Sequence, residues 1–257
     1  MQGIVKLNIL QFSLIYLLLL VVLAVMKKSK INQTHLLITA SIRMTVQLVL
    51  AGLILTYIFE TPHPIFVVIY ISAMIVFSIK RVLSKTKDIN KNFKIAVSLS
   101  LAFSGLSVLI YFVYIVVGES VFNPQYTIPI AGMIIGNSMT GVTLALKTFT
   151  ENIKSQRSKI DALLNMGATP KKILLPYVNN AIETALLPTL NSMLGMGIVS
   201  LPGMMTGQIL SGTLPTTAIM YQIAIMIAIC TSVCLTVFCS LNFGYKTLYN
   251  KRNQITY

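Results

Sequence analysis

The sequence predicts an all-α protein, a polytopic integral membrane bundle of about seven transmembrane helices. Apolar residues make up 55% of the 257 residues and charged residues only 10%, whereas about 25% of the residues in soluble domains are charged. The mean hydropathy is +0.80. Apolar segments long enough to span a bilayer recur along the chain, and lysine and arginine are concentrated in alternate loops between them.

A window of about 20 residues finds the apolar segments that we expect to span the membrane. They cover residues 4–25, 36–59, 65–79, 95–117, 127–146, 178–200 and 217–241. They fit one transmembrane domain over residues 1–257. The first segment is not expected to be a cleaved signal peptide, because its positive charges Lys27, Lys28 and Lys30 follow it rather than precede it.

The positive charges predict an orientation in the cell membrane. Of the 20 lysines and arginines, 18 follow the first, third, fifth or seventh segment, and the loops at 60–64, 118–126 and 201–216 contain none. Because cytoplasmic loops are enriched in lysine and arginine, the N-terminus is expected outside and the C-terminus in the cytoplasm. Most of the net charge of +14 is therefore expected on the cytoplasmic side, where lysines and arginines face anionic lipid headgroups. Because the lipid accounts for this charge, nucleic acid is not an expected partner.

Residues 187–212 are apolar yet rich in prolines and glycines. Irregular backbone is tolerated in a membrane only where protein or water surrounds it, and Asn191 and Gln208 are costly against lipid. We expect the span 178–200 to end at the outer face. A separate short helix or re-entrant turn then begins at Pro202 and Gly203, and it either lines a passage or forms a subunit contact.

A short internal similarity links two segments. Residues 132–141, GMIIGNSMTG, and 203–212, GMMTGQILSG, align without gaps, with Asn137 opposite Gln208 and with Pro129 and Pro202 upstream. Both contain Gly-x-x-x-Gly, which permits close helix approach. The segments are either equivalent elements that flank one outer cavity, as in transporters with parallel repeats, or coincidentally similar. Methionines are frequent in and near both segments. They are either ligands for a soft metal ion or ordinary packing residues, so the sequence does not decide whether a metal site is present.

Two charged residues, Arg43 and Glu183, fall well inside apolar segments rather than near the chain terminus. Arg43 and Glu183 lie at similar depths from the cytoplasmic ends of their segments. Membrane charges usually face the protein interior and pair, so an Arg43–Glu183 pair is one interpretation. The alternatives are that Arg43 extends to the headgroups or contacts substrate. Gln47 shares the helix face of Arg43.

The loop after the fifth segment predicts a compact helix–turn–helix over residues 147–176. Thr148 and Glu151 have the spacing of a capping box, from which a helix would run to residue 166. Gly167 is a candidate residue to end that helix. Thr169 and Pro170 are a suitable N-cap and first residue for the next helix.

The end of this loop, IDALLNMGATPKKILLP, resembles the cytoplasmic coupling loop of ATP-binding-cassette (ABC) permeases. Asp161 takes the place of the acidic residue, Ala162 of a small residue, and Gly167 of the glycine six residues after the acid, and Leu175-Pro176 closes the loop. Leu-Pro comes early relative to that pattern, and a leucine replaces the second small residue.

The resemblance extends over nearly the whole chain. GMIIGNSMTG, LPGMMTGQILSGTLP and the pair Arg43 and Gln47 resemble the FetB-like family of bacterial iron export permeases, which is related to plant aluminium-tolerance membrane proteins. The resemblance implies the membrane-spanning subunit of an ABC transporter that exports a metal ion, with iron as the candidate. It also implies a homodimer and a separate ATP-binding subunit that uses the ATP.

Other functional classes receive less support. The chain contains no Gly-x-x-x-x-Gly-Lys-Ser/Thr loop and no His-Glu-x-x-His, and with 6 acidic residues it offers little for a carboxylate pair. We therefore expect no enzyme activity and no cofactor bound by this chain. The three cysteines of the last segment are expected to be buried apolar residues. The alternatives are an ABC importer permease, an ATP-independent ion carrier or channel, and a membrane enzyme or assembly factor.

Overall fold

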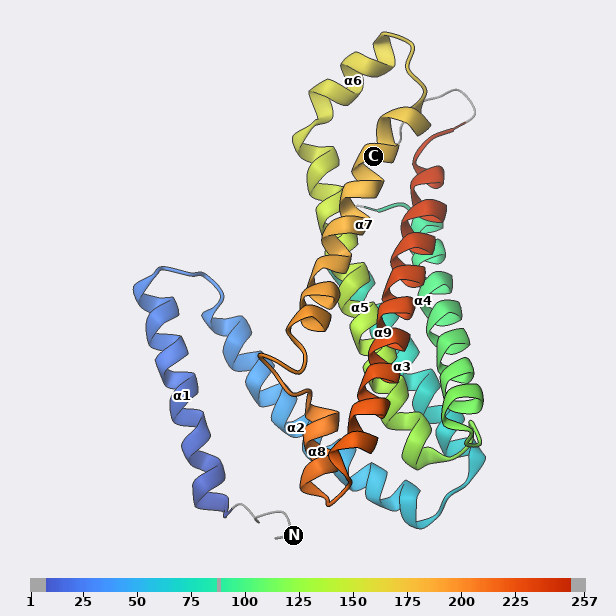
Figure 1. Cartoon of the computed structure of the whole chain (residues 1–257). Helices are drawn as coiled ribbons and strands as arrows, with labels where there is room; N and C mark the ends of the chain where they lie inside the picture. The colour runs from blue at the N-terminus through green and yellow to red at the C-terminus, as the bar shows by residue number, and fades with distance from the viewer. Residues whose placement is uncertain (1–7, 87–88, 251–257) are drawn as a thin grey trace.

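The computed structural model describes residues 8–86 and 89–250. Helices dominate these residues, and no strand occurs among them (Figure 1). The elements are α1 (Ile9–Lys28), α2 (Thr34–Glu60), α3 (Pro64–Lys85), α4 (Lys91–Tyr111) with a π-helical end (Phe112–Val117), α5 (Pro124–Ser155), α6 (Arg157–Asn165), α7 (Pro170–Gly195), α8 (Gly203–Leu210) and α9 (Pro215–Gly244) with a 3₁₀ turn (Tyr245–Leu248).

The core lies between α3, α4, α5, α7 and α9. Helix α9 packs against α4, α5 and α7, and α5 also packs against α3. At the end of α9, a Cβ on Gly244 would overlap the ring of Phe93 from α4, so this close approach requires glycine. Deeper in the bundle, the hydroxyls of Ser138 and Ser232 lie 2.9 Å apart in a buried hydrogen bond between α5 and α9.

Helices α1 and α2 form an arm that diverges from this core (Figure 1). The hydroxyls of Tyr16 and Thr45 lie 2.6 Å apart and join the two helices. None of the apolar window of α1 is buried and only 6% of that of α2, against 50% for α5 and α9. The arm therefore has apolar surface that lipid or another chain must cover.

The predicted all-α membrane bundle is confirmed. Among the described residues, six helices are long and apolar enough to cross a membrane: α1, α2, α3, α4 with its π-helical end, α5 and α9. Helix α7 is not among them, because it carries Asn179, Asn180 and Glu183, but it lies against α5 and α9 in the bundle. A seventh span, and with it the orientation of the termini, remains a prediction.

The prediction for the end of α7 was wrong. The helix ends at Gly195, not near residue 200. Gly197 has a φ of +81°, which glycine adopts without strain, and its N–H donates to the carbonyl of Ser200 at 3.0 Å. The short helix expected after Pro202 is confirmed as α8, with Pro202 as its N-cap and α9 as its packing partner.

Most connections that follow α2 group at two ends of the bundle, whereas the α1–α2 connection lies apart from both (Figure 1). The α5–α6–α7 turn, the start of α4 and the end of α9 lie at one end, which we call the basic end because the sequence there is rich in lysine and arginine. The connections α2–α3, α4–α5 and α8–α9 lie at the other, which we call the distal end. This grouping agrees with the alternation of positive charge along the chain.

Candidate functional site

The α5–α6–α7 turn extends past the rest of the bundle at the basic end (Figure 1). It is anchored by apolar side chains on its inner side, since Ile153, Ile160 and Ile173 are buried. Asp161 and Ala162 follow the anchor directly and are exposed. The turn is therefore held by its buried inner side, while its outer surface is exposed and accessible to a partner.

Hydrogen bonds fix the predicted turn at Gly167. This glycine has a φ of +86°, its N–H donates to Leu164 O at 2.9 Å, and the N–H of Ala168 donates to Leu163 O at 3.0 Å. The two bonds form the Schellman arrangement, which satisfies the carbonyls at a helix end. Thr169 is the N-cap of α7 and Pro170 its first residue, so the predicted helix end and the start of the next helix are confirmed.

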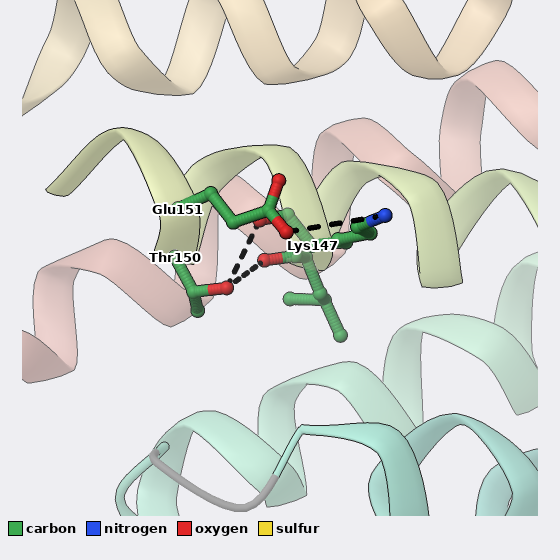
Figure 2. Close-up of polar contacts among 4 residues, drawn as sticks. Lys147, Thr150 and Glu151 are labelled. Atoms are coloured by element: carbon green, nitrogen blue, oxygen red, sulfur yellow. Dashed lines mark hydrogen bonds and ion pairs between the residues drawn. The ribbon is translucent and has the colours of Figure 1, made fainter. Parts of the chain in front are cut away.

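The predicted capping box was wrong, and Figure 2 shows the contacts that Glu151 and Thr150 make along α5 instead. Thr148 and Glu151 lie inside α5, which continues to Ser155. Glu151 approaches Lys147 one turn earlier, with Oε1 and Nζ 3.9 Å apart, and Thr150 Oγ1 donates to the carbonyl of Leu146 at 2.8 Å. The helix continues because its inner side is buried in the core, which outweighs a local capping signal.

The remaining residues of the coupling resemblance lie on α7. Leu175 and Pro176 are both exposed, and Pro176 lies within the helix rather than at its end. The exposed set at the basic end is thus Asp161, Ala162, Gly167, Leu175 and Pro176. A rigid, exposed turn of this kind can transmit a push from a docked protein into α5 and α7.

A pocket of about 220 Å³ lies between α5, α7 and α9. We call it the polar pocket because amide and hydroxyl groups share its lining with apolar side chains. Asn137 and Thr140 of α5 line it opposite Thr189 and Ser192 of α7, and Met226 of α9 completes it. Asn137 Nδ2 donates to the carbonyl of Met133 at 2.7 Å. No charged side chain lines the pocket, so amide and hydroxyl groups are the polar groups that it offers to a solute.

The Arg43–Glu183 pair is absent from the described residues. The guanidinium of Arg43 lies over the ring of Phe77 on α3, 5.8 Å from its centroid, and Glu183 is exposed on α7. Gln47, one turn from Arg43, is also exposed. Asn191 is exposed beside the pocket residue Ser192 but does not line the pocket.

The distal end holds the other predicted site residues. Pro202 lines a second cavity, between the end of α7, α8 and α9. Gly203 begins α8, and a Cβ there would meet open space. Gln208 has its Oε1 buried without a hydrogen-bond partner. Of the two interpretations of the similarity between 132–141 and 203–212, the structure favours coincidence, because the first segment is the middle of α5 and the second is a short helix at the distal end.

Sequence reasoning missed the composition of both cavities. The pocket combines residues from three helices that are far apart in the chain, and no spacing rule relates Asn137 to Ser192 or Met226. No group of three or more histidine, cysteine, aspartate or glutamate side chains that could hold a metal ion occurs in residues 8–86 and 89–250.

Comparison with known proteins decides the family. The model of the "Uncharacterised protein family (UPF0014)" matches residues 9–249. The chain belongs to the UPF0014 family. This confirms the resemblance on which the sequence-based interpretation rested, and it confirms a multi-pass membrane protein.

Two bacterial relatives match over nearly their whole length, and a plant relative matches over about half of it. The "UPF0014 membrane protein YjkA" of Bacillus subtilis is 30% identical over 96% of this chain and 97% of its own. The "Probable iron export permease protein FetB" of Escherichia coli is 32% identical over 96% and 95%. The plant "Protein ALUMINUM SENSITIVE 3" of Arabidopsis thaliana is 39% identical over 48% of this chain and 47% of its own. No solved structure matches.

Proposed function

We propose that this UPF0014 member is the membrane-spanning permease subunit of an ABC transporter that exports a metal ion, with iron as the candidate. The exposed turn at Asp161–Gly167 carries the proposal, because it combines an anchored base, a fixed helix end and a resemblance to ABC coupling loops. The relative from Escherichia coli, a probable iron export permease, supports export and iron. The ATP would be bound and used by a separate subunit.

The proposed mechanism is mechanical. A docked ATP-binding subunit would grip α6, and its closure would tilt α5 and α7 together, since both helices meet at the turn. These two helices form opposite walls of the polar pocket. Motion at the basic end would then open or close the pocket that a solute must cross.

A second copy of this chain is part of the proposal. ABC transporters need two membrane halves, and the α1–α2 arm exposes apolar surface that another copy would cover in part. Arg43 and Gln47 are exposed on α2, where lipid contact is costly. A second subunit would give these two side chains a polar environment.

The test uses the full chain purified with its ATP-binding subunit. Asp161→Lys should abolish both complex formation and permease-dependent ATP turnover, because it reverses the charge on the exposed face of α6. Glu60→Lys, with the same change of charge at the far end of α2, is the matched control and should leave both intact. Gly167→Pro should act like Asp161→Lys, because proline cannot adopt a positive φ.

The outcome can contradict the proposal clearly. If Asp161→Lys and Gly167→Pro elute as folded protein and retain complex formation and ATP turnover, the turn does not couple. Ion flux in liposomes that contain this chain without any ATP-binding subunit would instead favour an ATP-independent carrier or channel.

A further inference from the structure

The cavity at the distal end of the bundle has an unusual lining. It measures about 530 Å³ and lies between the end of α7, α8 and α9. Met193, Met196, Met205 and Met226 line it, together with Gln222 and aliphatic side chains. Three separate segments thus place four thioethers around one space, which no single helix periodicity would produce.

Gln222 is the feature that packing alone does not explain. Its side chain is 8% exposed, and its Oε1 is buried without any hydrogen-bond partner. Its Nε2 donates to Met196 Sδ at 3.9 Å, a contact with a weak acceptor. An amide oxygen left unsatisfied in the interior is costly, and a bound ligand that accepts its lone pair would remove that cost.

We propose that this cavity is a binding site for a soft monovalent metal cation, Cu(I) or its analogue Ag(I), held by methionine sulfurs and the Gln222 carbonyl oxygen. Thioethers select soft ions, whereas Mg²⁺, Ca²⁺ and Mn²⁺ prefer carboxylate, carbonyl and water ligands. No charged or imidazole side chain lines the cavity. A neutral lining favours a single positive charge, because the cost of removing an ion from water rises steeply with its charge.

The position of the cavity connects it to the polar pocket. Met226 lines both spaces, so an ion that leaves the pocket between α5 and α7 meets a thioether shared with the distal cavity. This connection rests on the proposed export function and would replace iron by a soft monovalent cation as the exported ion, whereas the binding site itself rests on the cavity lining alone. Binding of the cation to the chain does not require an ATP-binding subunit, so the two proposals can be tested separately.

The cysteines must be removed before the site is tested. Cys230, Cys234 and Cys239 lie on α9 outside the cavity lining, and thiols also bind soft metals. The test protein is therefore the full chain with C230A, C234A and C239A, reconstituted in lipid nanodiscs. The probes are Ag⁺ directly and Cu(I) in competition with a chromophoric Cu(I) chelator.

The central variant is Met196→Leu with Met205→Leu, since leucine conserves volume and removes the sulfur. We expect the cysteine-free protein to bind one Ag⁺ per chain with sulfur ligands in X-ray absorption, and the double variant to lose at least tenfold in affinity. Gln222→Leu should also weaken binding. Met44→Leu with Met220→Leu, two exposed positions outside the cavity, is the matched control and should bind like the parent.

Each result decides the proposal. Failure of the cysteine-free protein to bind Ag⁺, unchanged affinity in the double variant, or equal binding of Zn²⁺ or Fe²⁺ would overturn it. Elution volume and melting temperature establish that each variant is folded. If silver binds but no ATP-binding subunit assembles with the chain, the metal site stands and the permease proposal falls. If an ATP-binding subunit assembles but silver does not bind, the permease proposal stands and the metal site falls.

Discussion

The segments 132–141 and 203–212 have similar sequences but different structures. The first lies in the middle of α5, where Ile134, Ile135 and Ser138 are buried. The second forms α8, of which only Met205 is buried, and ends in a turn at Gly212. Similar residues thus serve helix packing in one segment and a short surface helix in the other.

The glycines make the contrast concrete. A Cβ on Gly141 would lie 2.7 Å from Val233 Cγ1, so glycine allows α5 to approach α9. Gly212, its counterpart, would meet no neighbour but has a φ of +99°. Gly136 and its counterpart Gly207 both face open space. The last glycine of each segment therefore serves helix contact in one and chain reversal in the other, whereas the Gly-x-x-x-Gly spacing marks no close helix contact at Gly136 or Gly207. The following substitutions test that distinction.

Gly141→Leu should have the largest effect. The new side chain overlaps Val233, and overpacking of this kind costs about 3 kcal/mol of stability. Thermal unfolding of the purified protein in detergent should show the loss, while Gly207→Leu in the second segment leaves the melting temperature nearly unchanged. Gly141→Ala combined with Val233→Ala should be more stable than Gly141→Ala alone; if it is not, the contact with α9 is not the cause.

Asn137→Leu should reduce transport about tenfold, which corresponds to about 1.4 kcal/mol in the barrier. Asn137 lines the polar pocket, whereas its counterpart Gln208 does not line either cavity of the proposed path. Metal accumulation in cells that lack the native protein and carry either variant is the measurement. Gln208→Leu should transport normally, and if Asn137→Leu does so too, the pocket is not the passage.

Helices and helix ends were predictable where neighbouring residues in the sequence are sufficient to determine them. The long helices follow from apolar length, and the end of α6 follows from Gly167, Thr169 and Pro170. Helix α8 follows from Pro202 and the glycines behind it. These signals depend on neighbouring residues in the chain, so no knowledge of the fold is needed to read them.

The wrong predictions concern features that are determined by contacts between residues distant in the sequence. The capping box at Thr148 and Glu151 is overridden by burial of Phe149 and Ile153. The lining of the pocket joins Asn137 to Ser192 and Met226 from three helices, a set that no single-sequence pattern can assemble. The similar sequences of 132–141 and 203–212 did not indicate that only the first lies in the centre of the bundle.

Gly212→Ala should cost about 1 kcal/mol, because an L-residue with a side chain is strained at positive φ. The strain acts on the turn before α9, so the melting temperature should fall modestly. Gly136→Ala, in the middle of α5, should instead be neutral or stabilising, since its Cβ meets open space and alanine favours the helix. Equal effects of the two substitutions would contradict the assignment of Gly212 to a left-handed turn.

Ser138→Ala should have the smallest effect, a loss of about 0.6 kcal/mol, which is typical of hydrogen bonds between membrane helices. Ser138 bonds Ser232 of α9, while the aligned residue of the second segment is Ile209, which has no hydroxyl. Ser211→Ala is the matched control, because the Ser211 hydroxyl is exposed and bonds only to its own turn. Unfolding of Ser138→Ala, Ser232→Ala and the double variant forms a double-mutant cycle. If the two losses simply add, the hydroxyls act independently, and the close approach of α5 to α9 rests on Gly141 and the packed aliphatic side chains alone.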